Sequence, residues 1–230
     1  MDGEMAQFTN SPIHQFSMIL EIRAAPPFFK NGFVVGCEDT REAVIIDPGD
    51  EVDALLAAID RHRLSVKYIL LTHAHIDHIT GVGTAKNALG APVGLHKGDL
   101  FLYKGVMQQG QMLGVHADPQ PDVDFFYDGA GPWRFGKYGA WVHHTPGHCP
   151  GGVCLAIGRE GESERTLFVG DTLFAGSIGR VDLPGGDLAT LLNSIRTVLF
   201  AFPDDTVVYP GHGERTTIGV EKRTNPFLIG

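Results

Sequence analysis

The sequence has few cysteines and no long apolar run. Its three cysteines are odd in number and include no Cys-x-x-Cys pair: Cys37, Cys149 and Cys154. This pattern argues against a framework of disulfide bonds and is typical of proteins in a reducing cytoplasm. No stretch of about 18 uninterrupted apolar residues occurs, which argues against a membrane span. Residues 1–16 lack the basic and apolar regions of a signal peptide. We therefore expect a cytoplasmic protein.

Basic residues are also scarce. The 18 Lys and Arg stand against 27 Asp and Glu, which gives a formal net charge of −9, and no run of Lys and Arg is visible. Such a chain repels nucleic acid and anionic membrane, so we expect neither as a partner. The length and a hydrophobic content of 43% are those of an ordinary globule, and no linker marks a boundary. We therefore expect a single domain over 1–230.

Short apolar runs and helical spacing predict sheets covered by helices, an α/β class. Helices are expected over 51–63 and 187–200, with Asp50 and Asp187 as their N-caps, and a shorter one over about 80–89. Strands are expected at 16–22, 33–35, 42–48, 66–72, 91–95, 141–145, 152–157, 166–171 and 206–211.

The region 99–131 is less regular than the rest of the chain. Its QQGQMLG stretch indicates the remnant of a helix, and its ADPQPD stretch indicates an exposed loop. Long irregular insertions beside a site act as lids or substrate walls, and elsewhere they are surface excursions. Both interpretations remain open from the sequence.

The segment THAHIDHITG, residues 72–81, places three histidines and an aspartate directly after the apolar run VKYILL. We expect that run to be a strand buried on both faces, and ligands of α/β proteins gather where such strands end. His73 and His75 lie two apart and can point the same way from an extended backbone. Imidazole and carboxylate suit zinc, iron or manganese, and Asp77 and His78 bring the set to four. Four ligands so close are better divided between two metals than crowded around one.

Three further candidate ligands share one setting. His148 in HTPGHCPGG, Asp171 in FVGDTLFAG and His212 in VYPGHGE each follow an apolar strand within glycine-rich sequence. Repetition of this setting brings ligands together on one edge of a sheet. The remaining histidines lack ligand spacing and are interpreted as structural or exposed: His14, His62, His96, His116, His143 and His144.

Together these motifs resemble the metallo-β-lactamase superfamily, over almost the whole chain from about Phe16 to His212. The resemblance implies a four-layer αββα sandwich of two mixed sheets, with two divalent metal ions at the sheet edges. Zinc is the metal expected first, and iron and manganese are the alternatives. The resemblance further implies two ligand sets and a bridge, with His73, His75 and His148 on one metal, Asp77, His78 and His212 on the other, and Asp171 between them. Asp47 in IIDPG matches a structural aspartate of the family.

The expected chemistry is attack by a hydroxide formed on a metal, because a bound metal lowers the pKa of water to near 7. Asp77 is the candidate catalytic residue, since it can orient this nucleophile or move its proton while serving as a ligand. A thiolate, with a pKa around 8.5, leaves without much help, whereas an amide nitrogen needs an acid, and none is evident. The residues therefore favour thioester or ester hydrolysis. Cys149 is interpreted as a packing residue, because the metals supply the nucleophile.

The stretch GDTLFAGSIGRVDLPGGD and the tail TNPFLIG are similar to small bacterial glyoxalase II-like proteins, of the hydroxyacylglutathione hydrolase type. This resemblance implies hydrolysis of S-(2-hydroxyacyl)glutathione. Arg180 stands nine residues after Asp171, the spacing of a lysine that helps bind the glutathione carboxylate in full-length glyoxalase II, and we place Asp182 in the same substrate region. An ion pair between Arg180 and Asp182 is the alternative. Only 18 residues follow His212, so the helical glutathione-binding domain of full-length glyoxalase II is expected to be missing.

Other activities of the superfamily remain alternatives. The Arg-x-Asp motif also resembles persulfide dioxygenases, which hold one iron at the positions matched by His73, His148 and Asp171. Hydrolysis of another ester or a lactone is a further alternative, and a metal-binding module without catalysis is a third class. Hydrolysis of β-lactams is less favoured, because the commonest zinc β-lactamases carry a cysteine where Asp171 stands.

Overall fold

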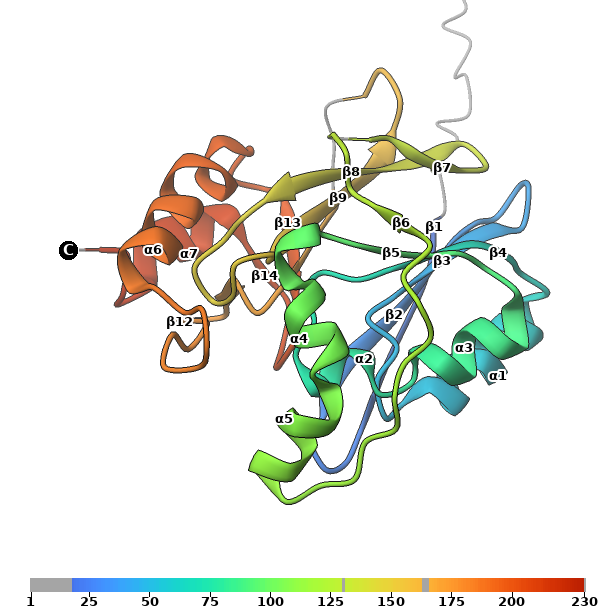
Figure 1. Cartoon of the computed structure of the whole chain (residues 1–230). Helices are drawn as coiled ribbons and strands as arrows, with labels where there is room; N and C mark the ends of the chain where they lie inside the picture. Colours follow the sequence, from blue (N-terminus) through green and yellow to red (C-terminus); the bar gives the residue numbers. More distant parts are fainter. Residues whose placement is uncertain (1–17, 130, 163–165, 230) are drawn as a thin grey trace, which may run out of the picture.

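The computed structural model describes residues 18–129, 131–162 and 166–229 (Figure 1). A first six-stranded sheet follows the order of the chain, with antiparallel pairing from β1 to β3 and parallel pairing from β3 to β6. Its strands are β1 (Met18–Ala25), β2 (Lys30–Cys37), β3 (Glu42–Ile46), β4 (Ser65–Leu70), β5 (Val93–Leu95) and β6 (Phe125–Phe126).

The second half of the chain forms another six-stranded sheet, in the order β14-β13-β10-β9-β8-β7. Its β10 and β13 run parallel and its other neighbours antiparallel, so this sheet is mixed as well. Its strands are β7 (Trp133–Phe135), β8 (Tyr138–His144), β9 (Val153–Arg159), β10 (Thr166–Gly170), β13 (Val207–Pro210) and β14 (Thr216–Thr217), and β11 (Leu173–Phe174) and β12 (Ser177–Ile178) form a separate hairpin.

Helices cover the outer face of each sheet (Figure 1). On the first sheet they are α1 (Val52–His62), α2 (Ile76–Ile79), α3 (Val82–Leu89), α4 (Leu100–Lys104) and α5 (Val106–Leu113), with a 3-10 turn η1 (Lys97–Asp99). On the second they are α6 (Leu188–Thr197) and α7 (Ile218–Thr224), with η2 (Leu199–Ala201). Within the described ranges, no helix is long and apolar enough to cross a membrane.

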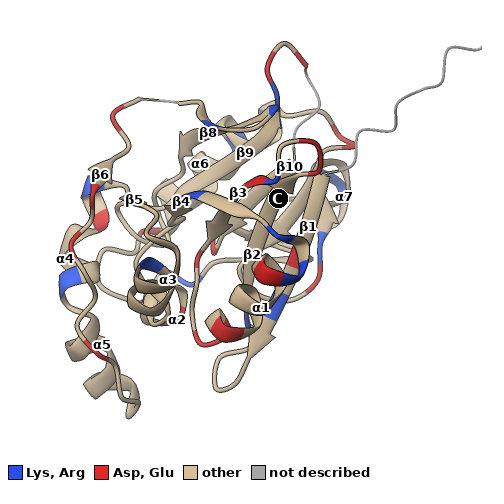
Figure 2. Cartoon of the chain, turned by 90° about the vertical axis from the view of Figure 1, so that its right-hand side faces the viewer, with Lys and Arg blue, Asp and Glu red and all other residues tan. Residues whose placement is uncertain are grey.

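Three apolar clusters account for this layering. The central one joins the two sheets, where Phe33 of β2 and Phe168 of β10 meet edge to face with ring centroids 4.9 Å apart. A second lies between the first sheet and its helices, where Leu55 of α1 is fully buried while the charged residues of α1 stay exposed (Figure 2). The third lies between the second sheet and α6, around Leu191 and Ile195. Three interfaces make four layers, which confirms the predicted αββα sandwich.

The predicted N-cap residue of one helix is wrong, and that of the other is confirmed. Glu51, not Asp50, occupies the N-cap position of α1. The Asp50 carboxylate accepts from the Thr80 hydroxyl at 2.9 Å, and that of Glu51 accepts from the buried Lys30 ammonium at 2.7 Å. Both candidates are therefore drawn into tertiary contacts that no local pattern reveals. Asp187 does cap α6, accepting the backbone amide three residues on at 2.7 Å.

Two further sequence expectations need correction. Strand β4 is fully buried only at its end, at Ile69 and Leu70, because its first half lies at the surface, where Lys67 pairs with Glu42 at 3.3 Å. The 99–131 region contains α4 and α5, followed by an irregular stretch over 114–124 and then β6. The predicted helix remnant is thus one of two real helices. Residues 16–17 of the first predicted strand and His14 lie outside the described residues.

Candidate metal centre

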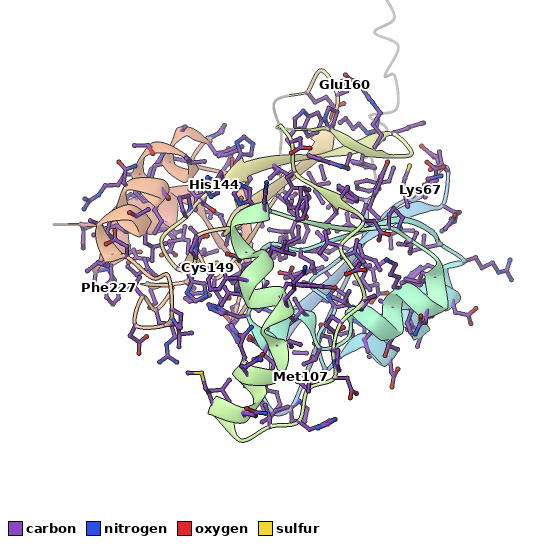
Figure 3. The ribbon with its side chains drawn as sticks, in the orientation of Figure 1. Lys67, Met107, His144, Cys149, Glu160 and Phe227 are labelled. Carbon is purple, nitrogen blue, oxygen red and sulfur yellow. The ribbon has the colours of Figure 1, made fainter. Side chains whose placement is uncertain are left out.

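The predicted metal-binding residues come together where strand ends of the two sheets meet. Figure 3 marks this place with Cys149, the neighbour of His148. The residues that the structure assembles here are His73 and His75 after β4, Asp77 and His78 in α2, His148 after β8, Asp171 after β10 and His212 after β13.

Potential ligand atoms form two adjacent groups. Those of His73, His75 and His148 all lie within 4.8 Å of one another, and Nδ1 of His75 is 2.8 Å from Nε2 of His148. Those of Asp77, His78 and His212 form the second group, and Oδ2 of Asp77 is 3.0 Å from Nε2 of His212. These groups have the composition predicted for the two metals; the assignment of ions to them stays a prediction.

Asp171 lies between the two groups. Its Oδ1 is 3.4 Å from Nε2 of His78, and its Oδ2 is 3.7 Å from Nε2 of His212 and 3.8 Å from Nε2 of His148. One carboxylate therefore reaches members of both groups. This is the position that a bridging ligand requires.

The buried atoms of the cluster fit a divalent cation. Nε2 of His73, His75 and His78 and Oδ1 of Asp171 are buried and have no hydrogen-bond partner among the described residues. An unsatisfied buried polar group costs about 1–3 kcal/mol, and such groups are rare in folded proteins. Coordination would give a bond to these atoms of His73, His78 and Asp171, whereas at His75 the atom that faces the group is Nδ1. The nitrogen and carboxylate donors suit zinc, iron and manganese alike.

The electrostatics of the cluster favour the same conclusion. Burial and neighbouring imidazoles hold the pKa of His73 well below its ordinary value and lower the pKa of His75 to about 3, so both are neutral, as ligands must be. Burial opposes ionisation of Asp77 and Asp171, but His78 and His212 outweigh it and lower the pKa of each carboxyl. Burial likewise disfavours a charged His78, yet those two carboxylates raise its pKa to about 10, so a metal ion bound here would displace the proton of His78. The site therefore attracts positive charge.

A model of the metallo-beta-lactamase superfamily matches residues 25–212. The chain belongs to this superfamily. A Haemophilus influenzae protein named hydroxyacylglutathione hydrolase GloC is 37% identical, over 92% of this chain and 98% of its own length. The structure of BLEG-1 B3 metallo-beta-lactamase is 36% identical with a TM-score of 0.82, over 92% of this chain and 100% of that one. A di-iron-bound form of TTHA1623 is 39% identical with a TM-score of 0.79, over 90% and 100%.

Membership of this metallo-hydrolase superfamily, together with the His and Asp cluster, supports a metal-dependent hydrolase that uses divalent ions. Zinc is not singled out, because the donor set is shared by several metals and one similar structure holds iron.

Asp47 positions one ligand of the superfamily centre. Its carboxylate accepts the backbone amide of Thr72 at 2.7 Å, the Thr72 hydroxyl at 2.5 Å and Nδ1 of His78 at 2.9 Å. The last bond leaves Nε2 of His78 facing the cluster. The carboxylate oxygens of Asp47 also lie near potential ligand atoms of His73 and His78. However, the three hydrogen bonds just described already occupy these oxygens. We therefore assign Asp47 to positioning, in line with its structural role in the sequence analysis.

Asp99 is a site residue that the sequence analysis missed. Its carboxylate is fully buried and accepts three hydrogen bonds, from the Ala74 amide at 3.1 Å, the Cys149 thiol at 3.1 Å and the Gly151 amide at 2.5 Å. It thus connects the loop that carries His73 and His75 with the loop that carries His148. No spacing marks Asp99 in the sequence, where it begins the irregular 99–131 region. Burial raises the pKa of the Cys149 thiol well above its ordinary value, which agrees with a packing role.

Lys30 and Asn31 at the start of β2 were also missed. Lys30 is buried, forms an ion pair with Glu51 at 2.7 Å and bridges through its backbone to His212. The Asn31 amide donates to the Gly211 carbonyl at 2.7 Å. These contacts attach the loop of His212 to the first sheet, although that loop follows a strand of the second. Only the folded chain brings them together.

Gly211, directly before His212, has a steric role. A Cβ at this position would lie 2.3 Å from Oδ1 of Asp171 and 2.7 Å from Cε1 of His78. Such contacts are too short for any side chain. The glycine-rich turn seen in the sequence therefore allows the His212 loop to approach the other ligands closely.

A pocket of about 280 Å³ opens above the cluster, and Arg180 lies in its wall. Nε and Nη2 of Arg180 each donate to the Asp182 carboxylate at 2.7 Å, and both side chains are exposed. The Arg180 carbonyl accepts from Nδ1 of His148 at 2.7 Å. The ion pair considered from the sequence is therefore present, while Asp182 lies outside the pocket lining. Substrate binding by either residue stays a prediction.

The other described histidines lie away from the two ligand groups, as their lack of spacing indicated. His62 pairs with Glu21, and His116 with Asp118 at the surface. His143 packs against a phenylalanine, while His96 and His144 stack with ring centroids 4.1 Å apart.

Proposed function

We propose that the protein hydrolyses thioesters of glutathione, with S-(2-hydroxyacyl)glutathione as the substrate. The observation that carries this proposal is the pair of ligand groups around Asp171, which lies in the floor of a pocket that also contains Arg180. The Haemophilus influenzae relative named hydroxyacylglutathione hydrolase supports the same substrate class.

Divalent ions held by these residues would provide hydroxide at neutral pH and polarise the thioester carbonyl. The Asp77 carboxylate lines the pocket and is kept ionised by the neighbouring histidines, so it can accept a hydrogen bond from the attacking water and orient it. The water oxygen bonds to the acyl carbon, the carbon–sulfur bond breaks, and its electron pair leaves with sulfur. A thiolate needs no acid to depart, so the products are a carboxylate and a thiol.

A mononuclear iron persulfide dioxygenase is the second candidate. It would use His73, His148 and Asp171, which are close enough here for Oδ2 of Asp171 to lie 3.8 Å from Nε2 of His148. That activity would leave the group of Asp77, His78 and His212 without a function, whereas the hydrolase uses both groups. We therefore favour the hydrolase.

A metal count with three assays tests the proposal. We expect about two metals per chain and hydrolysis of S-lactoylglutathione. One iron per chain with oxygen uptake on glutathione persulfide would overturn it, as would faster hydrolysis of a β-lactam, the class named for the BLEG-1 structure. Metal binding without turnover of any of the three substrates would also contradict it.

Arg180→Ala should raise KM for a glutathione thioester more than it lowers kcat. The guanidinium would bind a substrate carboxylate equally in the ground and transition states, so its loss affects binding. Because the side chain is exposed, we expect an increase in KM of about fivefold.

Arg134→Ala is the matched control for this experiment. Arg134 is equally exposed and also holds a carboxylate, that of Glu160, but it does not line the pocket. Steady-state kinetics of both variants decide the role of Arg180, and an unchanged KM in Arg180→Ala would remove it from the substrate site.

A further inference from the structure

The walls of the pocket are apolar apart from the predicted ligands, Arg180 and Gln109. The apolar residues that line it are Phe28, Ile76, Leu102, Met112, Leu113, Leu183 and Pro184. They come from the β1–β2 turn, α2, α4, α5 and the loop between β12 and α6. A substrate seated over the metal centre therefore meets mainly hydrocarbon.

The polar groups of these walls already have partners. Oε1 of Gln109 accepts from the Ile76 amide at 3.0 Å, and its Nε2 donates to the carbonyls of Ala74 at 3.1 Å and Leu102 at 2.9 Å. The Arg180 guanidinium is engaged by Asp182. A polar group at the far end of the acyl chain would thus lose its bonds to water and find few replacements here.

The end of α5 exposes large apolar side chains to this pocket. Met112 is 73% exposed and Leu113 is 53% exposed, and neither belongs to the apolar clusters of the described chain. Helix α5 itself carries no Lys, Arg, Asp or Glu (Figure 2). Apolar side chains left at the mouth of a site gain stability when a ligand covers them, and methionine adapts its shape readily.

We propose that Met112 and Leu113, together with Phe28, form an acyl-binding subsite, so that the preferred substrates are thioesters whose acyl chain is unbranched and apolar beyond the carbon next to the carbonyl. This inference rests on the proposed thioester hydrolysis and narrows its substrate class. Arg180 lies on the loop after β12, whereas Met112 and Leu113 lie on α5, and all three residues line one pocket. The charged glutathione part of the substrate and its apolar acyl chain would therefore contact different walls of the pocket.

A series of S-acyl glutathiones with one constant thiol tests the subsite. Burying a methylene fully contributes about fourfold to binding, and a half-exposed wall about twofold, so kcat/KM should rise about 15-fold from acetyl to hexanoyl. Binding of thioethers gives a readout without turnover. By calorimetry, S-hexylglutathione should bind about 30-fold more tightly than S-methylglutathione.

Variants of α5 locate the effect. Met112→Gln and Leu113→Asn should both flatten the rise with chain length. Met107→Gln is the matched control, because Met107 is 46% exposed on the same helix but does not line the pocket (Figure 3). Its chain-length series should equal that of the wild type.

The possible failures are distinguishable. Thioester hydrolysis with no dependence on chain length would overturn the acyl subsite and leave the hydrolase standing. No hydrolysis of any acyl glutathione would overturn the proposed function itself. Loss of the chain-length dependence in Met107→Gln, or its persistence in both pocket variants, would contradict the assignment to Met112 and Leu113.

Discussion

Asp171→Asn is expected to lower kcat/KM for thioester hydrolysis by about 10³-fold, the effect of losing roughly 4 kcal/mol of transition-state stabilisation. Asp171 lies within 3.8 Å of ring nitrogens in both ligand groups, whereas Asp77, the other carboxylate of the two groups, pairs with His78 and His212 of the second group. The amide keeps the size of the side chain and removes the negative charge. The metal content per chain should therefore fall below that of the wild type.

Elemental analysis and steady-state kinetics measure the two expected losses in Asp171→Asn. Asp124→Asn is a suitable control, because the Asp124 carboxylate has partners too, the Val93 amide and the Lys86 ammonium, but lies at the edge of the first sheet. Its metal content and kinetics should match the wild type. A wild-type metal content and activity in Asp171→Asn would show that the carboxylate does not bridge.

The gathering of the predicted ligands could be expected from the sequence, because each of these residues lies in a local pattern that the fold preserves. Both Asp171 and His212 directly follow a glycine at the end of an apolar strand, and the structure places their side chains 3.7 Å apart at one edge of the sheet. Helix α6 was predictable for a similar reason, since the periodicity and the cap at Asp187 agree. Local sequence therefore specified which residues gather at this edge and roughly where each element lies.

The residues that support the ligands were not predictable, because their contacts join distant parts of the chain. Lys30 bridges to His212, and Asp99 bonds Gly151 across 52 residues. The same applies to the cap of α1, where Glu51 turns toward Lys30. The short strands β11, β12 and β14 have two residues each and carry too little pattern to detect.

The apolar wall of the pocket was hidden for a different reason. Met112 and Leu113 lie in the irregular 99–131 region, where a lid or substrate wall and a surface excursion were equally open. Their exposure beside the metal centre distinguishes these alternatives, because a pocket is a property of the folded surface. The sequence alone therefore constrains the chemistry more tightly than the substrate.

Asp99→Asn should weaken metal binding by about 10- to 100-fold, the usual consequence of losing a group that orients ligands. The carboxylate accepts the amides of Ala74 and Gly151 with different oxygens. Asparagine offers one oxygen and one NH2 group, so its NH2 group must face one of these two backbone N–H groups, and two donors then meet. Either loop of the His73, His75 and His148 group then shifts. We also expect the free energy of unfolding to fall by about 2 kcal/mol.

Glu221→Gln separates positioning of the ligands from general stability. Glu221 is as buried as Asp99 and also accepts three hydrogen bonds, from the Gly176 amide at 3.0 Å, the Thr216 hydroxyl at 2.6 Å and the Asn225 amide at 2.8 Å. Its partners lie outside the ligand loops, so removing its charge should lower the stability of the protein and leave the metal affinity unchanged. Chelator competition gives the affinity, and denaturant unfolding of metal-free protein gives the stability. If both variants lose stability and neither loses metal affinity, Asp99 supports the fold alone, because its two loops would then hold their ligands without it.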